Sequence, residues 1–402
     1  MKKMRKTIFI IQVLFVLLFV SSCLQETTKN TVLWHKTTLL FEGPELKENK
    51  NTFLDYRLQV EFVHAETGKK YNVPGFFAAD GNAAETSAES GKIWKAHFVP
   101  DETGEWTYKA SFRKGDKVAI SFEKVVGESA GFFDGQSGKI VVAEPGNNMD
   151  DSDFRSKGML KYVGEHFLQF AGSKEYFLKG GAGSPETLLA YEDFDHTYDN
   201  GGKKLPALGE DQLHAYQPHA DDWKNGDPVW KDSLGTELIG AINYIADMGI
   251  NASYFVTMNV SGDGQDVWPW TAPDNRFVYD VSKLEQWDIV FDHMDSKGIM
   301  KEVILTETEN ESLFEVEDGG DFADSRKLYF REMVARFSHN LLISWGLGEE
   351  ITWDNKRHGP HGEPISIDQI KKFAAYLKKM DPYNHHIVLH STPFLEEKLF
   401  HP

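Results

Sequence analysis

Two adjacent carboxylates follow a run of apolar residues. Residues 343–348, Ile-Ser-Trp-Gly-Leu-Gly, are typical of a buried strand, and Glu349 and Glu350 come directly after it. Because side chains alternate along a strand, the small residues at every second position share one face, and Glu350 falls on that face. A carboxylate that is close to a second acid and shielded by aromatic rings has a raised pKa, as a general acid requires. We therefore expect Glu350 to point into a cleft as a proton donor.

Acids, amides and aromatic residues also follow the other apolar strands. Parallel β/α folds bind ligands at the C-terminal ends of their strands. Carboxylates and amides hydrogen-bond hydroxyl groups, and tryptophan faces cover sugar rings, so we predict a site for a poly- or oligosaccharide. Two alternatives stay open: a tryptophan more often fills a core, and most acids of residues 306–321 could form a solvated loop. The predicted contact residues are Glu186, Asn259, Trp268, Trp270, Glu307, Glu349 and His390.

The strands that would position these residues alternate with amphipathic helices. The pairs Ser282 with Glu285 and Ser366 with Gln369 predict capping boxes at two helix starts. Strands that are apolar on both faces and alternate with helices indicate a parallel sheet. The predicted strands span residues 176–180, 251–259, 300–306, 341–348 and 386–390.

A doubly wound sheet and a barrel both fit this alternation, although no G-x-G-x-x-G or Walker sequence follows a strand. A (β/α)8 barrel has eight strands. We interpret residues 155–402 as an incomplete TIM-type (β/α)8 barrel with about five of the eight strands, so we expect a C-terminally truncated barrel. His358 and His361 lie in a loop pattern and are interpreted as polar loop residues rather than as a metal site.

Residues 33–145 have a different pattern. Short runs rich in Val, Tyr, Phe and Trp are separated by Gly, Pro, Asp and Asn, about ten residues apart. No amphipathic helix is visible there, which predicts a small antiparallel, Ig-like β-sandwich. Residues 144–154 are typical of a linker between this domain and the barrel region.

The first 23 residues have a basic start, an apolar run that is short for a transmembrane span, and the sequence Ser-Ser-Cys at the end. This segment resembles a bacterial lipoprotein signal peptide with its lipobox, which implies that Cys23 is lipidated and that residues 24–32 form a tether. An ordinary signal peptide with an incidental cysteine is the alternative. The resemblance implies a lipid anchor to a membrane, at the outer membrane or at the cell surface or periplasm.

Composition limits the possible partners. The formal net charge of −19 argues against nucleic acid, whose phosphates require basic patches. Cys23 is the single cysteine, so neither a disulfide framework nor a thiolate metal site is expected, and we predict no cofactor.

The run Trp-Gly-Leu-Gly-Glu-Glu resembles the strand-4 motif of clan A glycoside hydrolases. Trp345, Leu347, Gly348 and Glu350 match that motif, whose final glutamate is the acid/base residue. Glu349 stands where the clan usually has an asparagine that touches the sugar, so the resemblance implies that Glu349 contacts substrate. The runs within 33–145, among them Pro-Asp-Glu-Thr-Gly-Glu-Trp-Thr-Tyr, resemble the β-sandwich that precedes the barrel in candidate secreted bacterial glycosidases.

These resemblances imply a glycosidase that retains anomeric configuration by double displacement. Such enzymes take their nucleophile from strand 7, which we do not find in the sequence, so we expect the nucleophile beyond residue 402 and an inactive or nearly inactive chain. The alternatives are a surface glycan-binding lipoprotein without catalysis and an inactive fragment.

Overall fold

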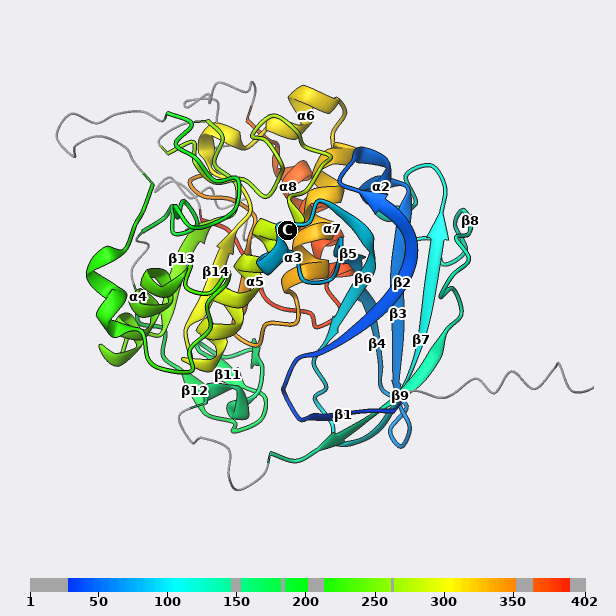
Figure 1. Ribbon diagram of the computed structural model, residues 1–402, viewed down its shortest axis with the longest axis horizontal. Helices are drawn as coiled ribbons and strands as arrows, with labels where there is room; N and C mark the ends of the chain where they lie inside the picture. The colour runs from blue at the N-terminus through cyan, green and yellow to red at the C-terminus, as the bar shows by residue number, and fades with distance from the viewer. Residues whose placement is uncertain are drawn as a thin grey trace, which may run out of the picture.

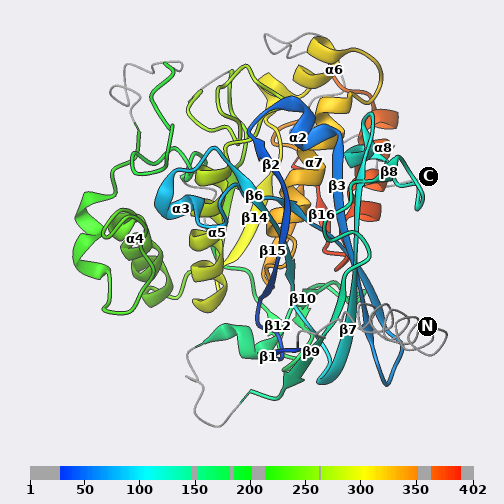
Figure 2. The same ribbon diagram turned by 45° about the vertical axis from the view of Figure 1, so that its right-hand side comes forward.

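The computed structural model describes residues 28–145, 153–181, 185–201, 213–261, 264–351 and 364–390. The predicted lipidation site Cys23, the loop histidines His358 and His361, and all residues after 390 lie outside these ranges. In Figures 1 and 2 the N-terminal β-sheets and a parallel β/α region lie on opposite sides of a layer of helices.

The N-terminal part consists of two sheets. The larger has the order β1-β9-β7-β3-β4, with β8 beside β7, and the smaller has the order β2-β6-β5. These strands are β1 Thr28–Val32, β2 Thr37–Lys47, β3 Tyr56–His64, β4 Lys70–Pro74, β5 Phe76–Phe77, β6 Ser90–Phe98, β7 Gly104–Lys114, β8 Glu128–Ser129 and β9 Ser137–Ala143. The short helices in this part are α2 Lys50–Leu54, α3 Ala83–Thr86 and the 3-10 turn η1 Val118–Ile120.

The two sheets enclose an aromatic core. The ring of Phe62 on β3 stacks on that of Phe98 on β6 with centroids 4.0 Å apart, and Trp94 on β6 meets Phe112 on β7 at 4.9 Å. Every second side chain of β3 from Leu58 onward is buried, as the alternation in its sequence predicts.

Two features of this part differ from the prediction. Residues 28–32, expected within the tether, form β1 and pair in parallel with β9. Helices α2 and α3 occupy a region in which no helix was expected. Helix α2 has only five residues, too few to show a helical periodicity, and it is held by the Asn49 side chain, which accepts hydrogen bonds from two backbone N–H groups.

The β/α part is built around a parallel sheet with the order β13-β14-β15-β16. Its strands are β13 Ala252–Val256, β14 Met300–Ile304, β15 Ile343–Gly346 and β16 Ile387–Val388. Its helices are α4 Thr236–Asp247, α5 Val281–Ser296, α6 Leu313–Asp318, α7 Asp324–Phe337 and α8 Ile367–Met380, with 3-10 turns η2 Phe154–Lys157, η3 Gln217–Asp222 and η4 Thr308–Asn310. A small antiparallel sheet, β10 Leu160–Lys161, β11 Leu168–Phe170 and β12 Tyr176–Phe177, lies beside it.

The register of the parallel sheet assigns its two faces. Phe255, Val303 and Trp345 are neighbours across the strands and are all fully buried on the helix side. Tyr254, Glu302 and Ser344 are neighbours on the opposite face. This agrees with the predicted parity, in which Trp345 faces the helices and Ser344 the other side.

The first predicted strand of the barrel is not a strand of the parallel sheet. Only Tyr176–Phe177 forms a strand, and it pairs antiparallel with β11. Residues 178–181 run along the edge of β13, where the Asn251 side chain donates to the Leu178 carbonyl and accepts from the Gly180 N–H. The Gly180 carbonyl also accepts from the Asn251 N–H at 2.9 Å, but these contacts form no ladder, and the described part of the sheet has four parallel strands instead of five.

One of the two predicted capping boxes is present. Ser366 and Gln369 cap α8 reciprocally. Helix α5 instead begins after Asp280, whose side chain accepts from the Lys283 N–H at 3.0 Å. Glu285 is engaged by the N-terminal sheets, because it pairs with Lys95 and accepts from the Ala84 N–H.

Helix α7 joins the two parts of the molecule. The Arg331 guanidinium donates to the carbonyls of Leu58 and Gly75, and Arg336 donates to the carbonyl of Phe77. The buried apolar residues of both parts form one continuous cluster. No helix in the described ranges combines the length and the apolar character that crossing a membrane requires.

Candidate active site

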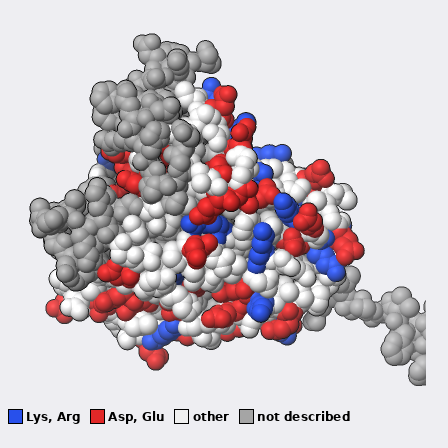
Figure 3. All heavy atoms as spheres, turned by 90° about the horizontal axis from the view of Figure 1, so that it is seen from above, with Lys and Arg blue, Asp and Glu red and all other residues white. Residues whose placement is uncertain are grey.

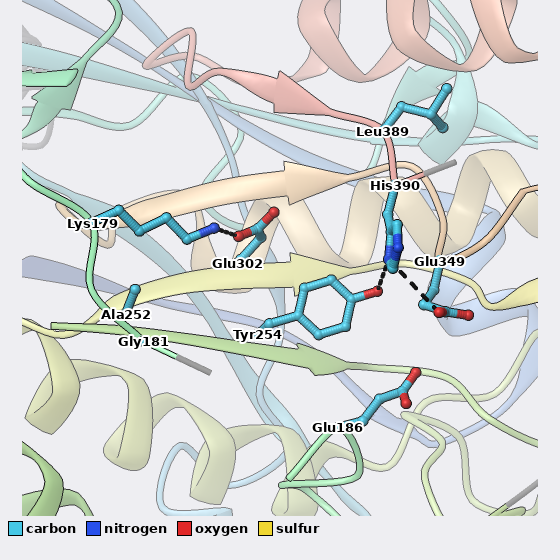
Figure 4. A pocket seen from close by; sticks show the side chains of 9 residues that line it. All are labelled: Lys179, Gly181, Glu186, Ala252, Tyr254, Glu302, Glu349, Leu389 and His390. Atoms are coloured by element: carbon cyan, nitrogen blue, oxygen red, sulfur yellow. Dashed lines mark hydrogen bonds and ion pairs between the residues drawn. The ribbon is translucent and has the colours of Figure 1, made fainter. Parts of the chain in front are cut away.

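A cavity of about 460 Å³ lies on the Tyr254 face of the parallel sheet. Figure 4 shows its lining side chains, which come from the strands and from the segments that follow them. The lining residues are Lys179, Gly181, Glu186, Ala252, Tyr254, Glu302, Glu349, Leu389 and His390. Three of the predicted site residues, Glu186, Glu349 and His390, therefore come together in one pocket.

The polar groups of this pocket lie at its two ends. At the C-terminal ends of the strands, the Tyr254 hydroxyl lies 3.0 Å from His390 Nδ1, and that nitrogen lies 3.7 Å from the Glu349 carboxylate. At the opposite end, Lys179 forms an ion pair with Glu302 (Figure 4).

Burial, and then the negative charges of Glu349 and Glu186, raise the pKa of Tyr254 well above its usual range. The Tyr254 phenol therefore stays protonated at neutral and moderately alkaline pH. It can donate a hydrogen bond to His390 or to an oxygen of a bound ligand.

Glu349, rather than Glu350, lines this pocket. Strand β15 ends at Gly346, and the Glu349 N–H donates to the Thr306 carbonyl at 2.8 Å. Glu350 has a left-handed backbone, with φ of 42°, so strict strand alternation does not continue to this residue. The alternation argument therefore does not extend to Glu350, because the chain leaves the strand conformation before it reaches the pair of acids, and its role as a proton donor stays a prediction.

Glu186 reaches the pocket from the segment beside β13. Its carbonyl accepts a hydrogen bond from the Val256 N–H at 2.9 Å. In Figure 4 its carboxylate lies near the Tyr254 hydroxyl, on the other side of it from the strand that carries Glu302. The pocket thus has acidic side chains on two sides of a phenol and an imidazole.

Asn259 and Glu307 form a buried pair that does not line the pocket. The Asn259 amide donates to Glu307 at 2.9 Å, and Asn310 donates to the other carboxylate oxygen at 2.8 Å. Glu307 is only 4% exposed. In this structure both residues make contacts within the protein, so the prediction that they touch substrate is not supported by their positions.

Trp268 and Trp270 are core residues. They are 1% and 0% exposed, so neither ring face is available to a sugar, and the predicted sugar platform is wrong. Isolated bridges from Asn259 to Val267 and from Trp270 to Tyr279 fold this segment back onto the protein. Trp270 then packs against Phe314 and Tyr329.

Sequence reasoning missed Lys179, Tyr254 and Glu302. A signal for two of them was available, because Tyr254 and Glu302 are polar residues inside predicted strands. Applying the alternation that places Ser344 on this face to the two neighbouring strands would have placed Tyr254 and Glu302 there as well. Lys179 carried no such signal.

Acidic and basic side chains are interspersed over the described part of the face shown in Figure 3.

The N-terminal β-sheets are followed by a parallel β/α region, and this arrangement resembles part of one solved structure described as a candidate glycoside hydrolase. Residues 30–113 match the family model described as Domain of unknown function (DUF5060). No curated protein matches the chain.

A candidate glycoside hydrolase from Bacteroides vulgatus ATCC 8482 is similar to this chain, with a TM-score of 0.55 and 15% identity. The match covers 90% of this chain and 56% of that protein, so the chain spans little more than half of its length. At this identity the likeness concerns the fold alone.

Two further solved structures match less well and carry no argument. A family 5 glycoside hydrolase from Bacteroides vulgatus ATCC 8482 has a TM-score of 0.30 and 16% identity, over 41% of this chain and 35% of that protein. A family 5 xyloglucanase from Bacteroides ovatus has a TM-score of 0.29 and 8% identity, over 90% of this chain and 63% of that protein.

Proposed function

We propose that this protein is a glycosidase that hydrolyses O-glycosidic bonds of a poly- or oligosaccharide. The observation that carries the proposal is the pocket of Glu186, Glu349, Tyr254 and His390 at the C-terminal strand ends of a parallel β/α sheet. Sites of such folds lie at these ends, and carboxylates beside hydroxyl-binding groups suit acid/base cleavage of a sugar. The fold-level likeness to glycoside hydrolases supports the same class.

The proposed mechanism is retaining double displacement with Glu350 as the general acid/base. The motif around Trp345 supports Glu350, whereas the pocket contains its neighbour Glu349, to which we assign a contact with the substrate. A retaining enzyme needs a second carboxylate about 5–5.5 Å from the first as its nucleophile. We assign no described residue to that role.

The first prediction separates the two neighbouring acids. In a protein that also supplies the nucleophile, Glu350→Gln should reduce hydrolysis of an unactivated oligosaccharide by roughly 10²–10⁴ in kcat, because proton transfer to the leaving group is lost. Azide should restore turnover of an aryl glycoside that has a good leaving group, because azide attacks without a general base. Glu349→Gln should mainly raise KM and should not respond to azide.

The measurement is release of reducing ends from a panel of polysaccharides, with the aryl glycoside assayed in parallel. Glu309→Gln is the matched control, since Glu309 is an acid on a neighbouring strand end that does not line the pocket. Azide rescue of Glu349→Gln instead of Glu350→Gln would reverse the two roles. Normal turnover in both variants would exclude this pair of acids.

A second candidate function is glycan binding without catalysis. It is favoured by one observation: the motif carboxylate Glu350 does not line the pocket. Saturable oligosaccharide binding that Tyr254→Phe weakens, without release of reducing ends by the wild type, would support this alternative.

We also propose that Cys23 is lipidated and anchors the protein to a membrane at the cell surface or periplasm. Labelling with a radioactive fatty acid in the producing bacterium should mark the wild type. Cys23→Ala should be unlabelled, and an equally labelled variant would contradict the proposal.

A further inference from the structure

Three side chains with metal-binding groups meet between the N-terminal sheets and the helices. His97 comes from β6, Asp288 from α5, and His339 follows α7. They are 5%, 9% and 2% exposed, and one nitrogen or oxygen of each lies within 4.8 Å of the others. The group is separate from the pocket on the Tyr254 face, with which it shares no residue.

The spacing of these atoms fits a coordination shell, and metal binding would have to replace one hydrogen bond, because His339 Nε2 also lies 3.0 Å from Asp292 Oδ1. His339 Nε2 lies 3.3 Å from Asp288 Oδ1, and His97 Nε2 lies 3.5 Å from Asp288 Oδ2. Ligands of a tetrahedral zinc ion with bonds of about 2.0–2.1 Å are about 3.3–3.4 Å apart. Asp288 Oδ1 is buried and accepts no hydrogen bond, which is costly for a carboxylate oxygen unless a cation satisfies it.

The ring of His97 is held in a suitable orientation. Its Nδ1 lies 2.8 Å from the Thr38 hydroxyl. When Nδ1 carries the proton and donates to that hydroxyl, the lone pair of Nε2 faces Asp288. Metal-binding histidines are commonly oriented by such a hydrogen bond at the other ring nitrogen.

Lys36 is the cation that now balances this group. Its ammonium lies 2.8 Å from Asp288 Oδ2 and also contacts Asp292. Asp292 can keep Lys36 as a partner if a metal ion takes over Asp288. The side chains of Lys36 and Asp292 are 24% and 31% exposed, which leaves an entry route from solvent.

We propose that His97, Asp288 and His339 bind a divalent transition-metal ion of the Zn²⁺ type, in competition with the ammonium of Lys36. Two imidazoles and one carboxylate suit Zn²⁺ or Co²⁺ better than Ca²⁺ or Mg²⁺, which prefer oxygen ligands. Because the ligands come from β6, α5 and the end of α7, the bound ion joins the N-terminal sheets to the helices. The site is structural and independent of the proposed hydrolysis.

The experiment uses the untagged protein carrying Cys23→Ser, which removes its only thiol. After treatment with a chelator, the protein is titrated with Zn²⁺, Co²⁺ and Mg²⁺ alone. We expect about one equivalent of Zn²⁺ to bind, and the intense visible absorption of tetrahedral Co²⁺ to appear. Zn²⁺ should raise Tm, whereas Mg²⁺ should not.

Three substitutions assign the binding to this group. His97→Gln and His339→Gln should each weaken Zn²⁺ binding at least about tenfold. Lys36→Met should strengthen it, because the competing ammonium is gone. His219→Gln is the matched control, since His219 also pairs with an aspartate, Asp222, but lies outside the group.

If a histidine variant fails to fold, the stronger Zn²⁺ binding expected of Lys36→Met still tests the proposal. Binding of less than about half an equivalent by the wild type would overturn the proposal. Equal affinities in the wild type, His97→Gln, His339→Gln and Lys36→Met would also overturn it, because the metal would then bind elsewhere.

Discussion

At the scale of single residues, Glu48 shows how burial can make a carboxyl group sensitive to alkaline pH. Its carboxylate accepts the Val281 N–H at the start of α5, at 2.8 Å. It faces a cavity of about 520 Å³ between the N-terminal sheets and the β/α loops. Burial, and then the negative charge of Asp280, raise the pKa of Glu48 to about 8.

This shift predicts how stability depends on pH. The ordinary pKa of the group is 4.5, so between pH 4.5 and about 8 the folded protein binds a proton that the unfolded chain releases. The stabilisation is complete below pH 4.5 and is lost as pH rises through about 8. Glu48→Gln, which stays uncharged, should gain about 1–2 °C in Tm over wild type at pH 9, equivalent to roughly 1 kcal/mol, and little at pH 5.

Thermal unfolding at the two pH values measures this difference. Glu66→Gln is the control, because Glu66 is an exposed residue of the same N-terminal part. The interpretation of Glu48 would be refuted by a Tm difference between Glu48→Gln and wild type that is the same at pH 5 and pH 9.

The pair Glu349 and Glu350 shows the limit of residue-level prediction. The sequence correctly places acids at the end of β15, and alternation correctly assigns Ser344 and Trp345 to opposite faces. It cannot foresee the left-handed turn at Glu350, because that turn depends on the Thr306 carbonyl and the Thr308 hydroxyl of the neighbouring segment. Which of the two acids lines the pocket could therefore be determined only from the structure.

At the scale of elements, glycine at position 181 lets one segment lie against the edge of β13. A Cβ added to Gly181 would lie 1.9 Å from the Ala252 carbonyl oxygen, which belongs to the backbone of β13 and cannot move aside. The segment also carries Glu186 to the pocket through its contact with Val256. The absence of a side chain at Gly181 thus helps to place Glu186 in the pocket.

Gly181→Ala should destabilise the protein by about 1–3 kcal/mol, since the added methyl group overpacks against the backbone. It should also weaken oligosaccharide binding, because Glu186 moves with the segment. Gly180→Ala is the matched control, for its Cβ would meet nothing closer than the Asn251 side chain at 3.7 Å. Chemical denaturation and a binding titration measure both effects, and equal behaviour of the two variants would contradict the argument.

Helices, strands and caps were predicted correctly where the signal lies within the segment itself. The prediction failed where the partner residues are distant in the sequence. The capping box of α8 is local, and it is present. At 178–180 the expected strand is replaced by contacts with Asn251 that form no ladder. The capping role of Glu285 was lost because Lys95 of β6 and the Ala84 N–H of α3 bind its carboxylate.

At the scale of the whole molecule, buried charges cross the boundary between the N-terminal sheets and the helices. Arg331 donates to two carbonyls of the sheet side and to Glu332 of its own helix. Lys95 reaches Glu285 of α5 in the opposite direction. The carbonyl partners of Arg331 and the carboxylate partner of Lys95 are reached only when both parts are folded and packed together, so the two parts should unfold cooperatively.

Calorimetry tests this coupling through Arg331. The wild type should unfold in one transition, whereas Arg331→Met should lose about 1–3 kcal/mol and show two, because the buried Gly75 carbonyl loses its Arg331 donor and Glu332 keeps only Arg336 as its cation. Arg113→Met is the control: Arg113 binds Asp134 and the Gly127 carbonyl within the N-terminal part, so its loss should lower stability without separating the transitions. Two transitions in the wild type, or identical traces for both variants, would show that the parts fold independently and that these buried contacts do not couple them.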